Sequence, residues 1–199
     1  DDTGAIHKDS SEEKNRGIGS MKKDQGVTIW FTGLPCCGKT TIADRVAVIL
    51  KEKGFMVERL DGDLVRQNFS RDLGFSKKDR DENIRRAIFL AKMLTRNNMV
   101  VLASFVTPYK KQRRKARKEI EQFVEVYVRC PVKICMKRDV KGMYQKALAG
   151  TIKHFTGVDD PYEEPEHPEL IVDTDIESVE ESVGKVLQKI EELGYLADS

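Results

Sequence analysis

The stretch from Gly33 to Thr40, GLPCCGKT, restricts the fold of this chain more than any other. It fits the pattern G-x-x-x-x-G-K-[ST], in which backbone N–H groups surround phosphate groups at the start of a helix. The apolar run VTIWFT precedes it, and apolar residues at helical spacing follow it. Lys39 is expected to reach the β- and γ-phosphates of a nucleoside triphosphate, and the Thr40 hydroxyl to ligate Mg²⁺.

The rest of the chain alternates between short apolar runs and helical patterns, which predicts an α/β fold with a mostly parallel five-stranded sheet and helices on both faces. The strands are expected within residues 27–32, 55–63, 99–106, 124–130 and 170–174. The helices are expected within residues 39–54, 76–98, 109–123, 132–139 and 178–194. Ser76 and Gly54 have the residue types of a helix N-cap and a helix C-terminus.

Length and composition predict one domain over residues 27–196, preceded by a polar segment at 1–26 that is expected to be a flexible tail or a linker. The 35 basic and 33 acidic residues nearly balance, which argues against a dedicated nucleic-acid binder. No apolar run approaches the roughly 20 residues that span a bilayer. The four cysteines and three histidines lack zinc-site spacing. A reduced, cytoplasmic protein is the simplest interpretation.

The phosphate-binding loop by itself leaves two classes open, a switch GTPase and a small-molecule kinase. A GTPase needs an N-K-x-D motif after a late strand, and the sequence has none. The D-x-x-G match from Asp139 to Gly142 follows a helical pattern rather than a strand. A kinase needs an acceptor site near the γ-phosphate, a lid that excludes water, and basic residues that balance charge.

Candidates for an acceptor site follow the second predicted strand, where ligands of parallel sheets bind. Asp61 could orient the waters of Mg²⁺ and Asp63 could approach an acceptor hydroxyl, although a turn with a helix-capping acid would give the same residues. Arg80 and Asn83 share a helix face, and Phe75 precedes that helix. Such a set can bind an anion and stack a base.

Two further segments allow alternative interpretations. Residues 142–157 have glycines at both ends and contain Phe155, which suits a hinged lid with an aromatic anchor, or else core packing of that ring. Most residues from Lys110 to Lys118 are basic. We expect a solvated helix whose first residues attract an anionic substrate, rather than a nucleic-acid surface, because aromatic residues are not interleaved.

Six motifs in this order give the chain a close resemblance to the adenylylsulfate kinase family: WFTGL with the loop, LDGD, LGFSKKDRDENIRR, SFVTPYKKQR, RDVKGMYQKA and HFTGVDDPYEEP. The family phosphorylates the 3′-hydroxyl of adenosine 5′-phosphosulfate (APS). The resemblance implies the P-loop NTPase fold with a mobile lid, and ATP and Mg²⁺ as cofactors. It also implies a homodimer, and fusion to or association with ATP sulfurylase. Another P-loop kinase with a small anionic acceptor, and a catalytically weak nucleotide-binding regulator, remain alternatives.

The resemblance also implies roles for individual residues. The ATP phosphates would be held by Gly33, Leu34, Pro35, Cys36, Cys37, Gly38, Lys39, Thr40 and Thr41, with Arg138 and Thr174 beside the adenine. APS would contact Asp63, Arg66, Phe75, Arg80, Asn83, Val106, Thr107, Lys141, His154 and Phe155, with its adenine between the two phenylalanines. The catalytic set would be Lys39, Asp61, Asp63, Thr107 and Lys141, and the metal would lie at Thr40 and Asp61.

Three positions depart from the family pattern. Thr107 stands where many relatives have a serine that has been assigned as a phosphoenzyme residue; we expect direct transfer from ATP instead. Lys110 replaces an arginine, so a bidentate contact there is in doubt. Pro35, Cys36 and Cys37 replace small polar or glycine residues. Thiols near a helix N-terminus can oxidise readily, but packing of the loop is the favoured role.

Overall fold

The computed structural model of this protein describes residues 25–196. The predicted tail at residues 1–26 lies almost entirely outside the described residues. The element order is β1 (Val27–Thr32), α1 (Lys39–Glu52), β2 (Val57–Asp61), α2 (Gly62–Asn68), α3 (Lys77–Thr95), β3 (Val100–Ser104), α4 (Lys110–Glu119), β4 (Phe123–Arg129), α5 (Val132–Arg138), α6 (Met143–Leu148), β5 (Leu170–Asp173) and α7 (Val179–Glu192). Within this part of the chain, no helix is long and apolar enough to cross a membrane.

The five strands form one sheet in the order β2-β3-β1-β4-β5, and every neighbouring pair is parallel. The predicted α/β fold with a five-stranded sheet is therefore confirmed. Strand β1 is central, with Ile29 opposite Leu102 on one side and Val124 on the other. All six residues of β1 are buried, because helices cover both faces of the sheet.

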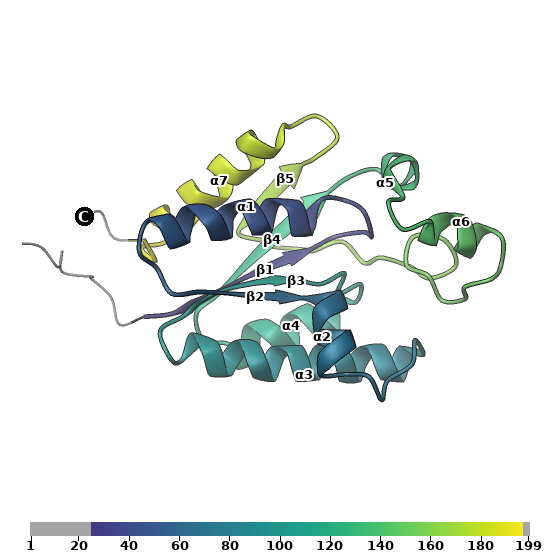
Figure 1. Ribbon diagram of the computed structural model, residues 1–199, viewed down its shortest axis with the longest axis horizontal. Helices are drawn as coiled ribbons and strands as arrows, with labels where there is room; N and C mark the ends of the chain where they lie inside the picture. Colours follow the sequence, from purple (N-terminus) through teal and green to yellow (C-terminus); the bar gives the residue numbers. More distant parts are fainter. Residues whose placement is uncertain (1–24, 197–199) are drawn as a thin grey trace, which may run out of the picture.

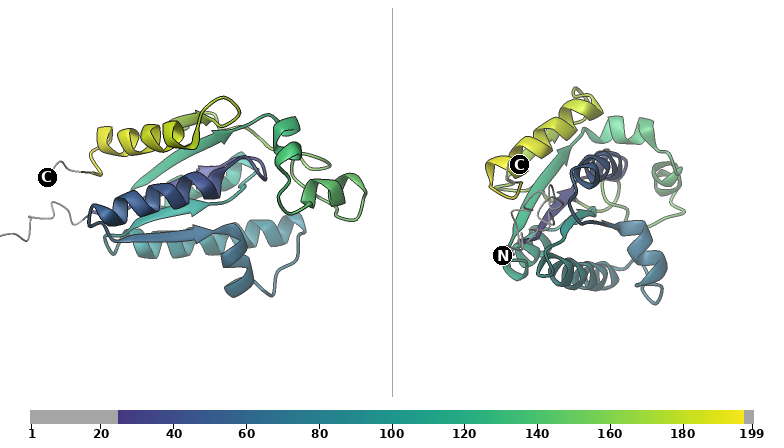
Figure 2. Two further views of the ribbon diagram at one scale, coloured as in Figure 1. Left: turned by 45° about the horizontal axis from the view of Figure 1, so that its top comes forward. Right: turned by 60° about the vertical axis from the view of Figure 1, so that its left-hand side comes forward.

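Helices α1 and α7 cover one face of the sheet, and α3 and α4 cover the other (Figure 1, Figure 2). The first face packs against Ile42, Val46 and Leu50 of α1 and Val186 of α7. The second packs around Trp30, with Ile88 among the residues of α3. The caps predicted from sequence are present: the Ser76 hydroxyl accepts a hydrogen bond from the Asp79 N–H at the start of α3, and Gly54, with φ 86°, follows α1.

Two short helices, α2 and α6, were not predicted. They have 7 and 6 residues, too few to show a helical repeat in the sequence. Each has a visible cap in the structure: the Asp61 carboxylate caps α2, and the Asp139 carboxylate accepts hydrogen bonds from two N–H groups of α6. Both helices lie beyond the carboxyl ends of the strands, with α5 and α6 at the right of Figure 1.

The parallel sheet places three sequence-distant segments at one edge. The phosphate-binding loop follows β1, Asp61 ends β2, and residues 105–109 follow β3. Ser104 lies opposite both Asp61 and Phe31 in the sheet register. The three segments therefore meet at the carboxyl edge, where ligands of such sheets bind.

Candidate active site

The phosphate-binding loop closes tightly around the ammonium group of Lys39. Its Nζ donates hydrogen bonds to the carbonyls of Gly33 and Leu34, at 2.9 and 2.7 Å, and the side chain is buried. Gly33 has no room for a side chain, because a Cβ there would lie 2.4 Å from the Val128 carbonyl oxygen. Gly38 has φ 103° and caps α1. The loop thus has the compact form that its sequence pattern predicts.

The two loop cysteines have different surroundings. Cys37 is fully buried in the core cluster under α1, and its Sγ lies 3.6 Å from Lys39 Nζ. Burial raises the pKa of the Cys37 thiol despite the nearby ammonium, so this cysteine is a packing residue rather than a reactive thiolate. Cys36 is partly exposed and has φ 61°. The Pro35 carbonyl accepts a hydrogen bond from the Tyr144 hydroxyl, which ties the loop to α6.

A hydroxyl and a carboxylate meet beside the loop. Thr40 Oγ1 donates a hydrogen bond of 2.9 Å to Asp61 Oδ2, although the two residues are 21 positions apart. The other oxygen of Asp61 accepts from the Asp63 N–H at 2.9 Å and so caps α2. The capping role considered from sequence is therefore real, and it leaves one carboxylate oxygen facing Thr40. Paired hydroxyl and carboxylate oxygens fit the preference of Mg²⁺ for oxygen ligands.

Asp63 and Lys141 form an ion pair between α2 and the turn that joins α5 to α6. Both side chains are well exposed. The hydrogen bond to the Asp63 carboxylate is the main reason why the pKa of Lys141 is raised. The pair brings the start of the predicted lid to the residue predicted to approach the acceptor hydroxyl.

Arg138 and Thr174, which are predicted to lie beside the ATP adenine, contact each other. The Arg138 guanidinium donates to both the hydroxyl and the carbonyl of Thr174, and the Thr174 hydroxyl donates to the Cys37 carbonyl at 2.7 Å. These contacts link the end of α5 and the turn after β5 to the phosphate-binding loop. Thr41 is exposed in the first turn of α1.

On the acceptor side, Arg66 and Phe75 contact each other. The Arg66 guanidinium lies 4.5 Å from the centre of the Phe75 ring and donates to the Gly74 carbonyl at 2.7 Å. Burial is the largest cause of the lowered pKa of Arg66. The Phe75 side chain is 63% exposed, so one ring face is open to a stacking partner.

Arg80 and Asn83 present unpartnered polar atoms on one face of α3. Arg80 Nε and Asn83 Oδ1 are buried and have no hydrogen-bond partner among residues 25–196. Arg80 Nη2 donates to the Asp160 carboxylate at 2.6 Å and to Tyr109 Oη at 3.1 Å. Buried donors and acceptors are normally paired, so these two atoms indicate a place for a polar ligand.

The far end of the predicted lid reaches the same arginine. The His154 carbonyl lies 3.2 Å from Arg80 Nη1, and the His154 backbone has φ 59°. Phe155 packs edge-to-face on Tyr144, with ring centres 5.0 Å apart, and is partly buried. Phe155 therefore packs against the core in this structure, as the core-packing alternative predicts.

Residues 106 and 107 are held from two sides. The Thr32 hydroxyl donates to the Val106 carbonyl at 2.7 Å. Thr107 is 1% exposed with φ 44°, and its hydroxyl accepts a 2.9 Å hydrogen bond from Trp30 Nε1. The hydroxyl considered as a phosphoryl carrier is thus buried against an indole. This placement argues for the backbone, rather than the hydroxyl, as the functional part of Thr107.

Most basic residues of α4 form ion pairs with acidic residues. Lys110 and Arg114 both contact Glu166, and Lys111 contacts Asp81. Arg117 contacts both Glu125 and Glu169. The sequence shows the charges but not their partners. Asp81, Glu166 and Glu169 lie 30 to 56 positions along the chain from the basic residues that they contact. The expectation that the first residues of this run attract an anionic substrate stays a prediction.

Comparison with known proteins agrees with this geometry. The profile of the family described as adenylylsulphate kinase matches residues 25–173. The adenylyl-sulfate kinase of Halothermothrix orenii is 57% identical over 176 residues, which cover 88% of this chain and 95% of that protein. The chain belongs to the adenylylsulfate kinase family. An adenylyl-sulfate kinase of Rippkaea orientalis, also 57% identical, is covered to 97% of its length.

Solved structures place this kinase in the same family. The APS kinase CysC of Mycobacterium tuberculosis, solved in complex with AMPPNP and APS, is 40% identical with a TM-score of 0.81. The match covers 84% of this chain and 98% of that one. A gluconokinase of Sinorhizobium meliloti, at 15% identity and a TM-score of 0.56, shares the fold only.

The sequence did not assign roles to several residues that hold the site of this kinase. Asp160 and Tyr109 fix the Arg80 guanidinium, and Tyr144 contacts the phosphate-binding loop. Asp160 and Tyr109 lie within the family motifs HFTGVDDPYEEP and SFVTPYKKQR, but these motifs do not show which residues they contact. Arg113, within the basic run, is buried against the Thr107 carbonyl. No spacing rule reveals such contacts, because each one joins different elements.

Proposed function

We propose that this chain transfers the γ-phosphoryl group of ATP to the 3′-hydroxyl of APS, giving 3′-phosphoadenylyl sulfate and ADP. The main structural support is the meeting of donor and acceptor elements at one edge of the sheet. The Thr40 hydroxyl at the loop lies 2.9 Å from Asp61, and Asp63, two residues later, pairs with Lys141. A phosphoryl donor on the loop and a hydroxyl near Asp63 would therefore face each other.

On the donor side, the ATP phosphates bind to the N-terminus of α1 and to the N–H groups of residues 33–38 other than Pro35. Lys39 exchanges its bonds to the Gly33 and Leu34 carbonyls for phosphate oxygens. Thr40 and Asp61 would hold Mg²⁺, which when bound balances the charge on the phosphates. Arg138 and the turn at Thr174 border the adenine of ATP.

On the acceptor side, Arg80 Nε and Asn83 Oδ1 supply the unpartnered donor and acceptor that a polar substrate requires. Arg66 adds positive charge, and the open face of Phe75 stacks the adenine of APS. The Val106–Thr107 backbone, His154 and Phe155 complete the site as the far end of the lid closes. Asp63 orients the 3′-hydroxyl, and Lys141 leaves its ion pair to approach the transferring group.

Transfer is direct in this proposal. A loose phosphoryl-transfer transition state depends on positioning and charge more than on a strong base, which suits a carboxylate such as Asp63. A covalent intermediate on Thr107 would require its buried hydroxyl to leave Trp30 Nε1. We therefore assign Thr107 a positioning role and no phosphoryl-carrying step.

The decisive experiment incubates the purified protein with Mg·ATP and APS and separates the products by ion exchange. We expect ADP and 3′-phosphoadenylyl sulfate in equal amounts. Lys39→Met is the control for the donor loop, and APS lacking its 3′-hydroxyl is the control for the acceptor. Absence of the 3′-phosphorylated product, under conditions where calorimetry shows that both nucleotides bind, would overturn the proposal.

We also propose that the kinase acts as a homodimer in the cytoplasm. The four free cysteines suit a reducing compartment, and the family resemblance supports the dimer. Light scattering tests the dimer, because it should report twice the 22.7 kDa chain mass. Fusion to, or association with, ATP sulfurylase stays a prediction from the resemblance, as does the role of residues 1–26.

A further inference from the structure

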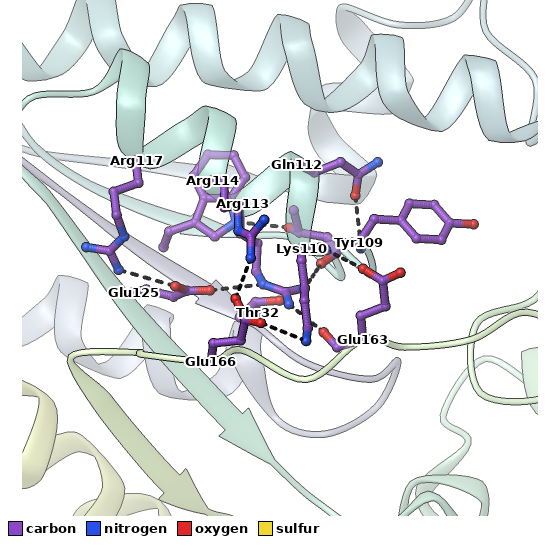
Figure 3. Close-up of polar contacts among 12 residues, drawn as sticks. Thr32, Tyr109, Lys110, Gln112, Arg113, Arg114, Arg117, Glu125, Glu163 and Glu166 are labelled. Atoms are coloured by element: carbon purple, nitrogen blue, oxygen red, sulfur yellow. Dashed lines mark hydrogen bonds and ion pairs between the residues drawn. The ribbon is translucent and has the colours of Figure 1, made fainter.

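Arg113 is a buried arginine that the proposed chemistry does not use. It lies on α4 within the basic run, and its side chain is 3% exposed. Its guanidinium donates to two backbone carbonyls, those of Thr107 and Glu163, and contacts the Glu125 carboxylate (Figure 3). A charged group this deeply buried needs such partners, because desolvation otherwise disfavours it.

The first carbonyl belongs to the loop after β3 that we assign to APS. Arg113 Nη1 lies 2.6 Å from the Thr107 carbonyl oxygen. Thr107 has φ 44°, a left-handed conformation that is unfavourable for a β-branched residue and persists only when its surroundings hold it. Trp30 holds the hydroxyl and Arg113 holds the carbonyl. The two contacts together hold the side chain of Thr107 and the peptide group between Thr107 and Pro108.

The second carbonyl belongs to the segment that follows the lid. We call residues 161–169 the strap, because they run from the lid back to β5. Glu163 donates its N–H to the Pro108 carbonyl at 2.8 Å, and its carboxylate accepts from the Lys110 N–H at 2.7 Å. Its carbonyl accepts from Arg113. Glu163 therefore attaches the strap directly to the acceptor loop and to the first residue of α4.

Neighbouring side chains of the strap strengthen this attachment. The Arg113 guanidinium also lies 5.6 Å from the centre of the Tyr162 ring, whose hydroxyl is 2.9 Å from Thr32 Oγ1. Lys110 and Arg114 contact Glu166 from the solvent side (Figure 3). The basic run thus holds the strap against α4. Among the described contacts, Arg113 is the only residue of the run whose side chain binds both the strap and the acceptor loop.

Glu125 on β4 orients the guanidinium. Its Oε1 lies 3.0 Å from Arg113 Nε, an ion-pair distance, although the angle is outside hydrogen-bond range. Its Oε2 accepts from Arg117 at 3.2 Å. Because a buried ion pair adds little net stability, its main effect here is to fix direction. With Nε turned to β4, the two Nη groups point to the acceptor loop and the strap.

We propose that Arg113 is a positioning residue that holds the Thr107 carbonyl and the Glu163 carbonyl in one fixed relation, so that the acceptor loop and the root of the lid move as one unit. The proposal rests on the assignment of the acceptor loop to APS. Lysine cannot replace the arginine, since a point charge cannot contact two carbonyls and a carboxylate in this planar arrangement.

The test compares Arg113→Lys with Lys115→Met, a charge change on the exposed side of the same helix. We expect the KM for APS to rise at least about tenfold in Arg113→Lys, the change for losing one charge-assisted hydrogen bond. The KM for ATP should change less than about twofold, because the donor loop has no contact with Arg113 among those described. Equal increases in both KM values would show a general structural role and overturn the proposal.

Hydrogen exchange gives a second measurement that does not depend on the substrate. In Arg113→Lys, peptides covering residues 104–109 and 161–166 should exchange faster, while those covering β1 and β4 remain protected. Faster exchange throughout the chain, or in neither segment, would contradict the proposal. If Arg113→Lys does not fold, Glu125→Gln is measured instead, and the same pattern with a smaller change is expected. If the wild type does not phosphorylate APS but Arg113→Lys shows the predicted exchange pattern, the proposed substrate is refuted. The proposed link between the acceptor loop and the strap then still stands.

Discussion

Arg80 on α3 and Asp160 after the lid form an ion pair of 2.6 Å in which both side chains are about one-seventh exposed. Tyr109 Oη donates to the same carboxylate oxygen at 2.8 Å. The pair joins the helix that carries Asn83 to the segment that carries Phe155. Arg80 Nε has no hydrogen-bond partner among residues 25–196. We infer that acceptor binding and the position of the predicted lid are linked through this carboxylate.

Replacing Asp160 by asparagine should therefore weaken the acceptor side selectively. We expect the KM for APS to rise about tenfold or more, because the guanidinium loses its orienting charge. The KM for ATP should stay within about twofold of wild type. Steady-state kinetics with each substrate varied in turn measures both values. Glu192→Gln is the control, since it breaks an ion pair of 2.7 Å with Lys189 at the end of α7. An unchanged KM for APS would contradict the link.

Asp61→Asn separates the two roles of this carboxylate. Asparagine caps a helix about as well as aspartate, so the melting temperature should change little. The charge facing Thr40 is lost, however, so the Mg²⁺ concentration for half-maximal activity should rise about tenfold. A magnesium titration at saturating ATP measures this change. The same half-saturation in the variant would remove Asp61 from the metal site.

Thr107→Ala tests direct transfer. It leaves the buried Trp30 Nε1 without its partner, so the free energy of unfolding should fall by about 1–3 kcal/mol, the cost of an unpaired buried donor. Turnover should persist, and intact-mass analysis of wild type after ATP should show no added phosphate. Thr107→Ser, which keeps the hydroxyl, is the control. Complete loss of turnover with both nucleotides still bound would instead support a phosphoenzyme.

The ion pairs of the strap predict a pH dependence. Hydrogen bonds from Arg114, and then from Lys110, lower the pKa of Glu166 from 4.5 to about 2. A carboxyl group with a lowered folded-state pKa stabilises the folded protein above its unfolded pKa, and this contribution is lost as the pH falls toward 2. The difference in melting temperature between wild type and Glu166→Gln should therefore be largest above about pH 5 and shrink below about pH 4.5. High salt should reduce it.

The control for this measurement is Glu121→Gln, in the exposed turn between α4 and β4. Its difference from wild type should stay flat over the same pH range. A constant difference for Glu166→Gln between pH 7 and pH 3 would mean that its ion pairs do not stabilise the strap.

The sequence by itself determined the phosphate-binding loop and the five strands of the sheet. The order strand, GLPCCGKT, helix requires a phosphate-binding loop, because glycine conformations and a helix N-terminus are local properties. The five strands were predicted because buried parallel strands form continuous apolar runs. The helices α2 and α6 were not, since 7 and 6 residues carry no periodic signal. Strand order and helix spacing suggested Asp63, Phe75, Arg80 and Asn83 as acceptor candidates, and the family motifs added the others.

The tertiary structure decided which charges are free and which are paired. The sequence shows a basic run on α4, and only the fold brings Glu166 and Glu169 against it. The sequence shows Thr107 as a hydroxyl, and only the fold buries that hydroxyl against Trp30. Contacts between residues 50 or more positions apart depend on how the elements pack, and no local pattern records them. The loop sequence therefore defines where phosphate binds, and the packing defines which side chains remain available to the acceptor.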